Sequence, residues 1–152
     1  MRESVGNSTL LYLVVSFSAI IMLFFVGIIS YSRAYGVKNR IIEIIEKENG
    51  WSENAISSVG ESIKEMGYTV TAANFCNKES VKNHMDKIGT YSLKNGAENG
   101  YSYCVYEVSY GSSGKYYVVV TFVSFNFPVI GNILSIPIYG ETQILGKSYD
   151  YS

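Results

Sequence analysis

The chain carries few residues of the types that do chemistry, and their spacing builds no recognised site. Its 152 residues include one histidine, His84, and two cysteines, Cys76 and Cys104. A His-rich metal site needs more ligands than these, and neither cysteine belongs to a C-x-x-C pair. No nucleophile elbow, zinc-protease motif or phosphate-binding loop occurs. We therefore predict no catalytic residue, no metal and no cofactor.

The two cysteines are better explained by a structural disulfide. Cys76 and Cys104 lie 28 positions apart. Closing that loop would stabilise the folded chain by roughly 3–4 kcal/mol on the chain-entropy model. A disulfide needs an oxidising compartment, and in the cytoplasm the same residues would be free thiols.

Six tyrosines crowd one stretch that has the pattern of a β-hairpin: Tyr101, Tyr103, Tyr106, Tyr110, Tyr116 and Tyr117. Tyrosine is favoured at recognition surfaces because its ring buries area while its hydroxyl stays in water. The hairpin is therefore a candidate contact surface. The alternative is that these tyrosines fill the core and the edge of a sheet. Nucleic acid is not an expected partner, because a formal net charge of −1 provides no basic field.

The element that positions the rest is the apolar stretch Leu10–Ile29, LLYLVVSFSAIIMLFFVGII. It has no proline and no ionisable group except the phenol of Tyr12. At ~1.5 Å per residue, a helix of this length covers the ~30 Å hydrocarbon thickness of a bilayer. The run is longer than the apolar region of a secretory signal, and no small-residue cleavage site follows it. We predict a retained, single transmembrane helix, preceded by a short polar leader at 1–9.

Helical spacing continues beyond the span, through Val37, Ile41, Ile44 and Ile45. We therefore predict one helix from about Ser8 to Glu48, with residues 30–50 extending into water. Inside the span, small residues lie near one helical face and would let a second helix approach closely. These helix-packing candidates are Ser16, Ala19, Gly27 and Ser30, with Leu23 between them.

The orientation of the span is a conflict between two rules. Arg33, Lys38 and Arg40 follow the span closely, which places the following domain in the cytoplasm if the positive-inside rule is taken alone. Two cysteines, fourteen tyrosines and Ser/Gly/Asn-rich strands suit an oxidising exterior. Long translocated domains also follow flanking charge poorly. We expect a single-pass protein of the cell membrane with an extracellular domain at 51–152.

That domain has the pattern of an α+β fold. Predicted helices run from the cap Ser52 to Gly67, with Ala55, Ile56, Val59, Ile63 and Met66 on one face, and over Glu79–Ile88, with His84 on the solvated side. Strands are predicted at Tyr68–Phe75, Tyr101–Tyr110, Lys115–Phe125 and Ile138–Leu145, and a loop at Gly89–Gly100. The strand Lys115–Phe125 is apolar on both faces, so it should be central. A small antiparallel sheet packed on the long helix accounts for these faces.

This plan resembles that of pilins. The run VVVTFVSFNFPVIGNILSIPIYGETQILGK is similar to the end of TadE-type pilus-assembly proteins and related small membrane proteins of Firmicutes. In that group a β-rich segment leads into an aromatic-Pro turn, here Phe127-Pro128-Val129-Ile130-Gly131, and a closing strand carries a small/polar pattern, here Gly140-Glu141-Thr142. The resemblance implies a non-catalytic structural subunit of a pilus or secretion assembly. Its partners would be the lipid bilayer and other pilin-like or assembly-platform subunits, including copies of itself.

One departure from the pilin pattern narrows this expectation. Type IV pilins and pseudopilins carry a glycine at a leader-peptidase site and a glutamate five residues into the mature helix. Gly6 is the candidate glycine before the span, and the residue five beyond it is Leu11. The resemblance then implies a minor, pseudopilin-like component more than a major fibre subunit. The alternative from another class is an anchored binding or adhesion module that uses the tyrosine-rich hairpin without polymerising.

Overall fold

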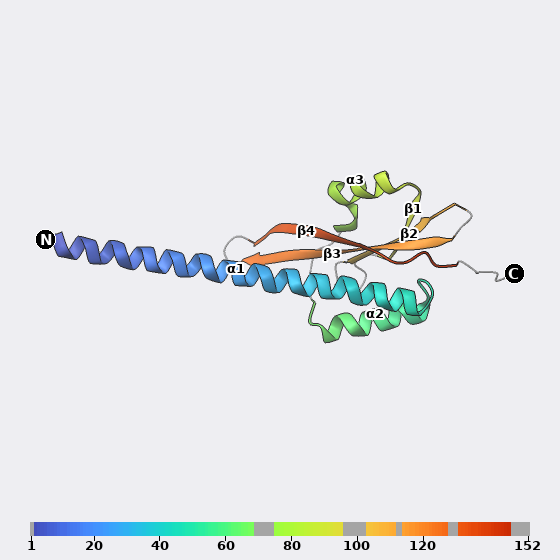
Figure 1. The fold of residues 1–152 in the computed structure, drawn as a ribbon, viewed down its shortest axis with the longest axis horizontal. Helices are drawn as coiled ribbons and strands as arrows, with labels where there is room; N and C mark the ends of the chain where they lie inside the picture. Colours follow the sequence, from blue (N-terminus) through green and yellow to red (C-terminus); the bar gives the residue numbers. More distant parts are fainter. Residues whose placement is uncertain (1, 69–74, 96–102, 112–113, 128–130, 147–152) are drawn as a thin grey trace.

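The computed structural model describes residues 2–68, 75–95, 103–111, 114–127 and 131–146. In chain order the elements are α1 (Arg2–Lys47), α2 (Glu53–Glu65), the 3-10 helix η1 (Phe75–Asn77), α3 (Glu79–Ile88), β1 (Tyr91–Asn95), β2 (Tyr103–Ser109), β3 (Lys115–Phe127) and β4 (Gly131–Glu141). The four strands form one antiparallel sheet in the order β1-β2-β3-β4. Helices α1 and α2 cover one face of the sheet, and α3 with η1 covers the other (Figure 1). The predicted α+β fold is confirmed.

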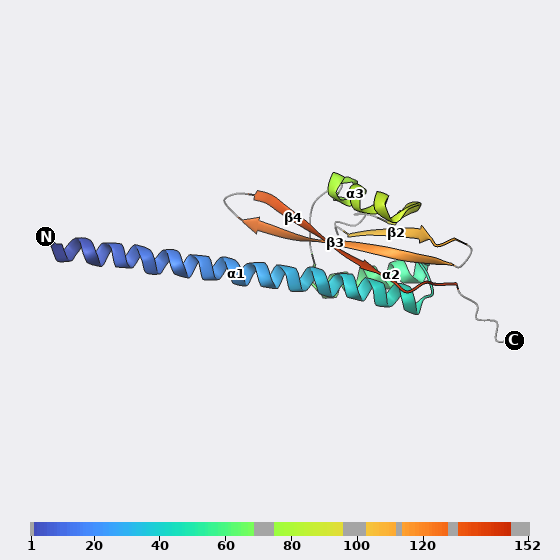
Figure 2. The same ribbon diagram turned by 45° about the horizontal axis from the view of Figure 1, so that its top comes forward.

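Helix α1 is one continuous rod with two different halves. Its N-terminal half projects beyond the sheet (Figure 2), and the residues of Leu10–Ile29 are exposed except for half-buried Gly27. Its C-terminal half buries Ala34, Val37 and Ile41. The apolar half is long and apolar enough to cross a membrane, and its N-terminal position also suits a signal sequence.

The strand β3 is buried on both faces, as its composition predicts. On one face, the Thr121 hydroxyl donates to the carbonyl oxygen of Ala34 in α1 at 2.9 Å. On the other face, the Phe122 ring lies 4.7 Å from the ring of Phe75 in η1. Because strand residues alternate between faces, Val118 and Val120 share the η1 side with Phe122. Both valines are fully buried. The core therefore lies on both sides of β3.

Helix α1 approaches β4 closely at Gly140. A Cβ atom built on Gly140 would lie 2.7 Å from both Ile42 Cδ1 and Lys38 Cδ. The Lys38 side chain is buried along its stem, and its ammonium lies 4.0 Å from the centre of the Tyr35 ring. Glycine at this position therefore lets the helix and the last strand touch.

The structure differs from two of the sequence-based strand predictions. The stretch expected to be a loop contains β1, in which Tyr91 pairs with Val108. This edge strand, YSLKN, is short and mostly polar, so its pattern does not distinguish it from a turn. The last strand begins seven residues earlier than predicted, at Gly131 rather than Ile138, and Pro137 lies inside it.

Pro137 is tolerated in β4 because its position needs no backbone donor. It pairs with Phe122 of β3. The N–H of Tyr117 donates to the Thr142 hydroxyl, and its C=O accepts from the Thr142 N–H. Both groups of Tyr117 therefore point to the β4 side. Since these groups alternate along a strand, those of Phe122 point away from β4. They bond instead to the hydroxyl of Tyr68, so Pro137 removes no bond from the ladder.

The helix predictions are largely confirmed. Ser52 caps α2, its hydroxyl accepting from Ala55 N at 3.2 Å, and Val59 and Ile63 are buried. Ile56 and Met66, also expected on this inner face, are each 40% exposed. Helix α3 has the predicted bounds and turns its Val81, Met85 and Ile88 inward. Of the predicted strand Tyr68–Phe75, residues 69–74 lie outside the described part, and Phe75 begins η1.

Candidate functional site

The predicted helix-packing residues lie on one face of α1: Ser16, Ala19, Leu23, Gly27 and Ser30. They are spaced by three or four residues, and the same spacing continues into Ala34, Val37 and Ile41, which are buried. Residues so spaced share a face, so the stripe in the apolar half continues the face that binds the sheet. The stripe is exposed except at half-buried Gly27 and Ser30. The Ser16 hydroxyl donates to the carbonyl oxygen of Leu13 and needs no other partner.

The tyrosine-rich hairpin is mainly a core feature. Tyr103, Tyr106 and Tyr117 are 6%, 3% and 1% exposed. The Tyr106 hydroxyl donates to the carbonyl oxygen of Cys76 at 3.0 Å. For these three residues the core interpretation replaces the contact-surface one, because their strand faces are covered by η1 or by α1. Of the others, Tyr110 is exposed and Tyr116 half-buried, while Tyr101 lies outside the described residues.

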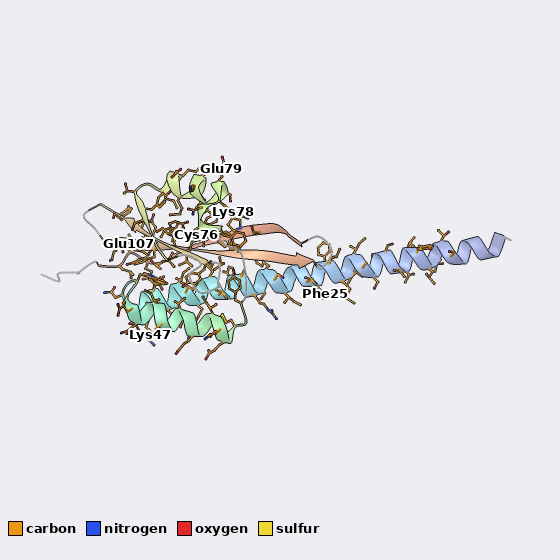
Figure 3. All side chains as sticks on the ribbon, turned by 180° about the vertical axis from the view of Figure 1, so that it is seen from behind. Phe25, Lys47, Cys76, Lys78, Glu79 and Glu107 are labelled. Atoms are coloured by element: carbon orange, nitrogen blue, oxygen red, sulfur yellow. A yellow bond between two sulfur atoms is a disulfide. The ribbon has the colours of Figure 1, made fainter. Side chains whose placement is uncertain are left out.

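The predicted disulfide is present between Cys76 and Cys104. Cys76 lies in η1 and Cys104 is the second residue of β2, where it is fully buried. The bond therefore ties the segment before α3 to the sheet, on the face opposite α1 (Figure 3). The pKa of Tyr106, whose ring lies beside this segment, is raised to about 12 by burial.

A charged cluster that the sequence did not indicate lies where α1 ends. Glu107 of β2 forms ion pairs with Lys94 and Lys115, each at 3.2 Å, and accepts a hydrogen bond from the Tyr117 hydroxyl at 2.8 Å. The cluster lines a hollow of about 370 Å³ together with Trp51, Ser52 and residues 48–50. The indole Nε1 of Trp51 is buried without a hydrogen-bond partner among the described residues. The only indication of this cluster in the sequence was Glu107, a charged residue on a strand face that is otherwise apolar.

Glu107 should make the stability of the domain sensitive to acid. Burial raises the pKa of this carboxyl, but hydrogen bonds from Tyr117, Lys115 and Lys94 outweigh it and hold the pKa below its ordinary 4.5. The folded state thus favours the carboxylate, and that stability is lost as pH falls through the lowered pKa. We expect Glu107→Gln to lower the unfolding free energy by about 1 kcal/mol at pH 7 and by less at pH 3.

This prediction is measured by thermal unfolding of the full chain in detergent micelles at the two pH values. The matched control is Glu61→Gln, on the exposed side of α2, which should change stability little at either pH. An effect of Glu107→Gln that is the same at pH 7 and pH 3 would contradict the assignment.

The single histidine is not the solvated residue that the sequence suggests. The ring of His84 is half-buried and stacks on that of Tyr139 in β4, with ring centres 3.9 Å apart. Helical periodicity could not indicate this contact, because it is made with a strand that lies far along the chain. Within the described ranges, no three His, Cys, Asp or Glu side chains gather as metal ligands.

Comparison with models of protein families, with curated proteins and with solved structures found no match to this chain. What the fold resembles is therefore judged from its architecture alone. A long, apolar N-terminal helix whose second half packs on a four-stranded antiparallel sheet is a pilin-like arrangement.

Proposed function

We propose that this protein is a membrane-anchored, pseudopilin-like structural subunit of a pilus or secretion assembly, similar to TadE-type proteins and without catalytic activity. The observation that carries the proposal is that one face of α1 runs through both halves of the helix. From Ala34 onward that face binds the sheet, and toward the N-terminus it continues as the exposed stripe of small residues. Such a stripe is suited to helix packing in a bilayer.

The continuity of α1 supports retention of the anchor. Cleavage near Ser30 would leave a new terminus four residues before Ala34, whose backbone carbonyl binds Thr121 of β3. Nothing in the helix separates the apolar half from the sheet-bound half: it is α-helical from Arg2 to Lys47. The apolar half therefore acts as a tether held rigidly to the domain.

The disulfide supports an extracytoplasmic domain. Disulfides form and persist in oxidising compartments and are rare in the cytoplasm. The basic residues Arg33, Lys38 and Arg40 argue for the opposite orientation, but Lys38 is buried against Gly140 and Tyr35. The Lys38 charge therefore takes part in a contact within the domain, which weakens it as an indication of orientation.

Cysteine crosslinking in membranes tests the proposed assembly. Since Cys76 and Cys104 are paired, an introduced cysteine is the free thiol. Ser16→Cys lies on the small-residue face, and Ser18→Cys lies about 200° around the helix and only about 3 Å further along it. We expect oxidation to give disulfide-linked dimers with Ser16→Cys and few with Ser18→Cys. Equal yields from both positions, or none from Ser16→Cys, would count against helix packing through this face.

A second candidate function is an anchored binding module that does not polymerise. The observation that favours it is the hollow where α1 ends, which Glu107 and Lys115 line together with Trp51. The indole Nε1 of Trp51 has no hydrogen-bond partner in the described part of the chain. Two results together would favour this alternative: no crosslinks at Ser16→Cys, and protection of Trp51 fluorescence from a soluble quencher when a ligand is added.

A further inference from the structure

We propose that the end of the β3–β4 hairpin, residues 124–127 and 131–136, lies in the interfacial layer of the bilayer beside α1. The domain would then contact lipid directly, in addition to being tethered by its helix. The inference rests on the proposed function, because it needs Leu10–Ile29 to lie in a membrane.

One hydrogen bond marks the level of the hairpin along α1. The Thr121 hydroxyl binds the carbonyl oxygen of Ala34, and from there β3 runs toward the N-terminal end of α1 (Figures 1 and 2). Phe127 follows six residues later, at most about 20 Å along the strand. That length equals about 13 residues of α-helix.

The position of the end of β3 beside α1 lies within this upper limit (Figure 3). The end of β3 lies at the same level along the long axis as the labelled Phe25 (Figure 3). The predicted span continues to Ile29, four residues beyond Phe25, which is about 6 Å of helix. The hairpin therefore passes the level where the apolar half of α1 ends.

The charge pattern of the hairpin fits this depth. No Lys, Arg, His, Asp or Glu occurs from Tyr116 to Gly140. The hairpin's charged residues, Lys115 and Glu141, lie at the opposite end, where α1 also ends. The end near the span carries Phe125, Phe127, Ile133, Leu134 and Ile136, and Ile136 is 49% exposed. These apolar residues are interspersed with Ser124, Asn126, Asn132 and Ser135, and the Lys78 ammonium binds the Ser135 hydroxyl. A segment that mixes apolar and polar residues in this way, without charged residues of its own, is suited to the interfacial layer, where an ammonium stays hydrated.

The interfacial layer fits the hairpin better than the hydrocarbon core does. Within the part of the sheet that the structure describes, β4 is an edge strand, so it has backbone groups without a ladder partner. Such groups are not tolerated in hydrocarbon but find water among the headgroups. Interfacial segments bury their apolar side by about 5–10 Å, which matches the overlap of about 6 Å with the span.

Tryptophan quenching by brominated lipids tests this contact in the full chain, reconstituted in phosphatidylcholine vesicles. Trp51 is the one natural tryptophan and lies at the opposite end of the domain, so it is the internal control. In a Trp51→Phe background, we place the reporter at Phe127→Trp, Ile136→Trp or Phe17→Trp, the last one deep in the span. Two reporters in the hairpin guard against one substitution that disturbs folding.

We expect Trp51 to be unquenched and Phe17→Trp to be quenched most by deeply placed bromine. Phe127→Trp and Ile136→Trp should be quenched most by bromine near the headgroups, with Ile136→Trp affected less because it lies nearer Thr121. If Phe17→Trp is quenched and neither hairpin reporter is, the inference is overturned but the proposed membrane anchor is retained. A hairpin covered by a second copy of the chain would give the same result and would also overturn the inference. Absence of quenching at all positions overturns both the inference and the proposed anchoring.

Discussion

The double variant Cys76→Ala/Cys104→Ala should unfold with a free energy lower by about 3–4 kcal/mol, because the disulfide closes a loop of 28 positions in the unfolded chain. For a domain of this size that corresponds to a melting temperature lower by about 15–25 °C. The bond joins η1 to the beginning of β2, so its loss should also release the cover over one face of the sheet. The measurement is near-UV circular dichroism of the full chain in micelles, which follows the tyrosines and not the helix of the span.

Reductant provides the matched control. It should lower the melting temperature of the natural chain by a similar amount and leave the double variant unchanged. A natural chain whose melting temperature is indifferent to reductant would contradict a stabilising disulfide.

Tyr68→Phe should be the second most damaging of these changes, at about 2–4 kcal/mol. Its hydroxyl accepts from the backbone N–H of Phe122 at 3.0 Å and donates to the carbonyl oxygen of the same residue at 2.8 Å. Tyr68 is 4% exposed, so the variant leaves two buried backbone groups without their partner. The exposed Tyr110→Phe is the control and should change stability by less than about 0.5 kcal/mol.

The same residue should give a signature at high pH. Burial raises the pKa of Tyr68 to about 12, although its hydrogen bond with the Phe122 backbone lowers it in part. The folded state thus holds the phenol proton, and the stability it contributes is lost as pH rises from about 10 to about 12. Tyr68→Phe should reduce this alkaline loss, with a remainder from Tyr106. An alkaline profile identical to that of the natural chain would contradict the assigned contact.

Elements with strong periodicity were predictable from the sequence. The long helix, the bounds of α3 and the central place of β3 follow from apolar residues that recur at helical spacing or fill both faces of a strand. The disulfide was predictable because two cysteines without metal-binding partners have few other roles. In each case a local pattern and the final fold agree.

The sequence-based predictions were wrong where tertiary contacts determine the structure. Pro137 suggested the beginning of a strand, but in the structure it occupies a position whose backbone points away from β3. His84 lies on the polar side of a helix and is nevertheless covered by Tyr139. The tyrosines Tyr103, Tyr106 and Tyr117 look like a recognition surface in sequence, whereas covering helices make them core. The Glu107 cluster joins three strands, and no local pattern could bring Lys94 to it.

The proposed anchoring, assembly and lipid contact all depend on an apolar helix that is retained and that carries the domain on its other half. The most direct measurement is the intact mass of the protein isolated from membranes after alkaline carbonate extraction, with sequencing of its N-terminal peptides. We predict that the chain stays in the membrane pellet and that Leu10–Ile29 is part of the mature polypeptide. A freely soluble mature chain that begins after residue 30 would contradict the anchor, the assembly through α1 and the lipid contact of the hairpin together.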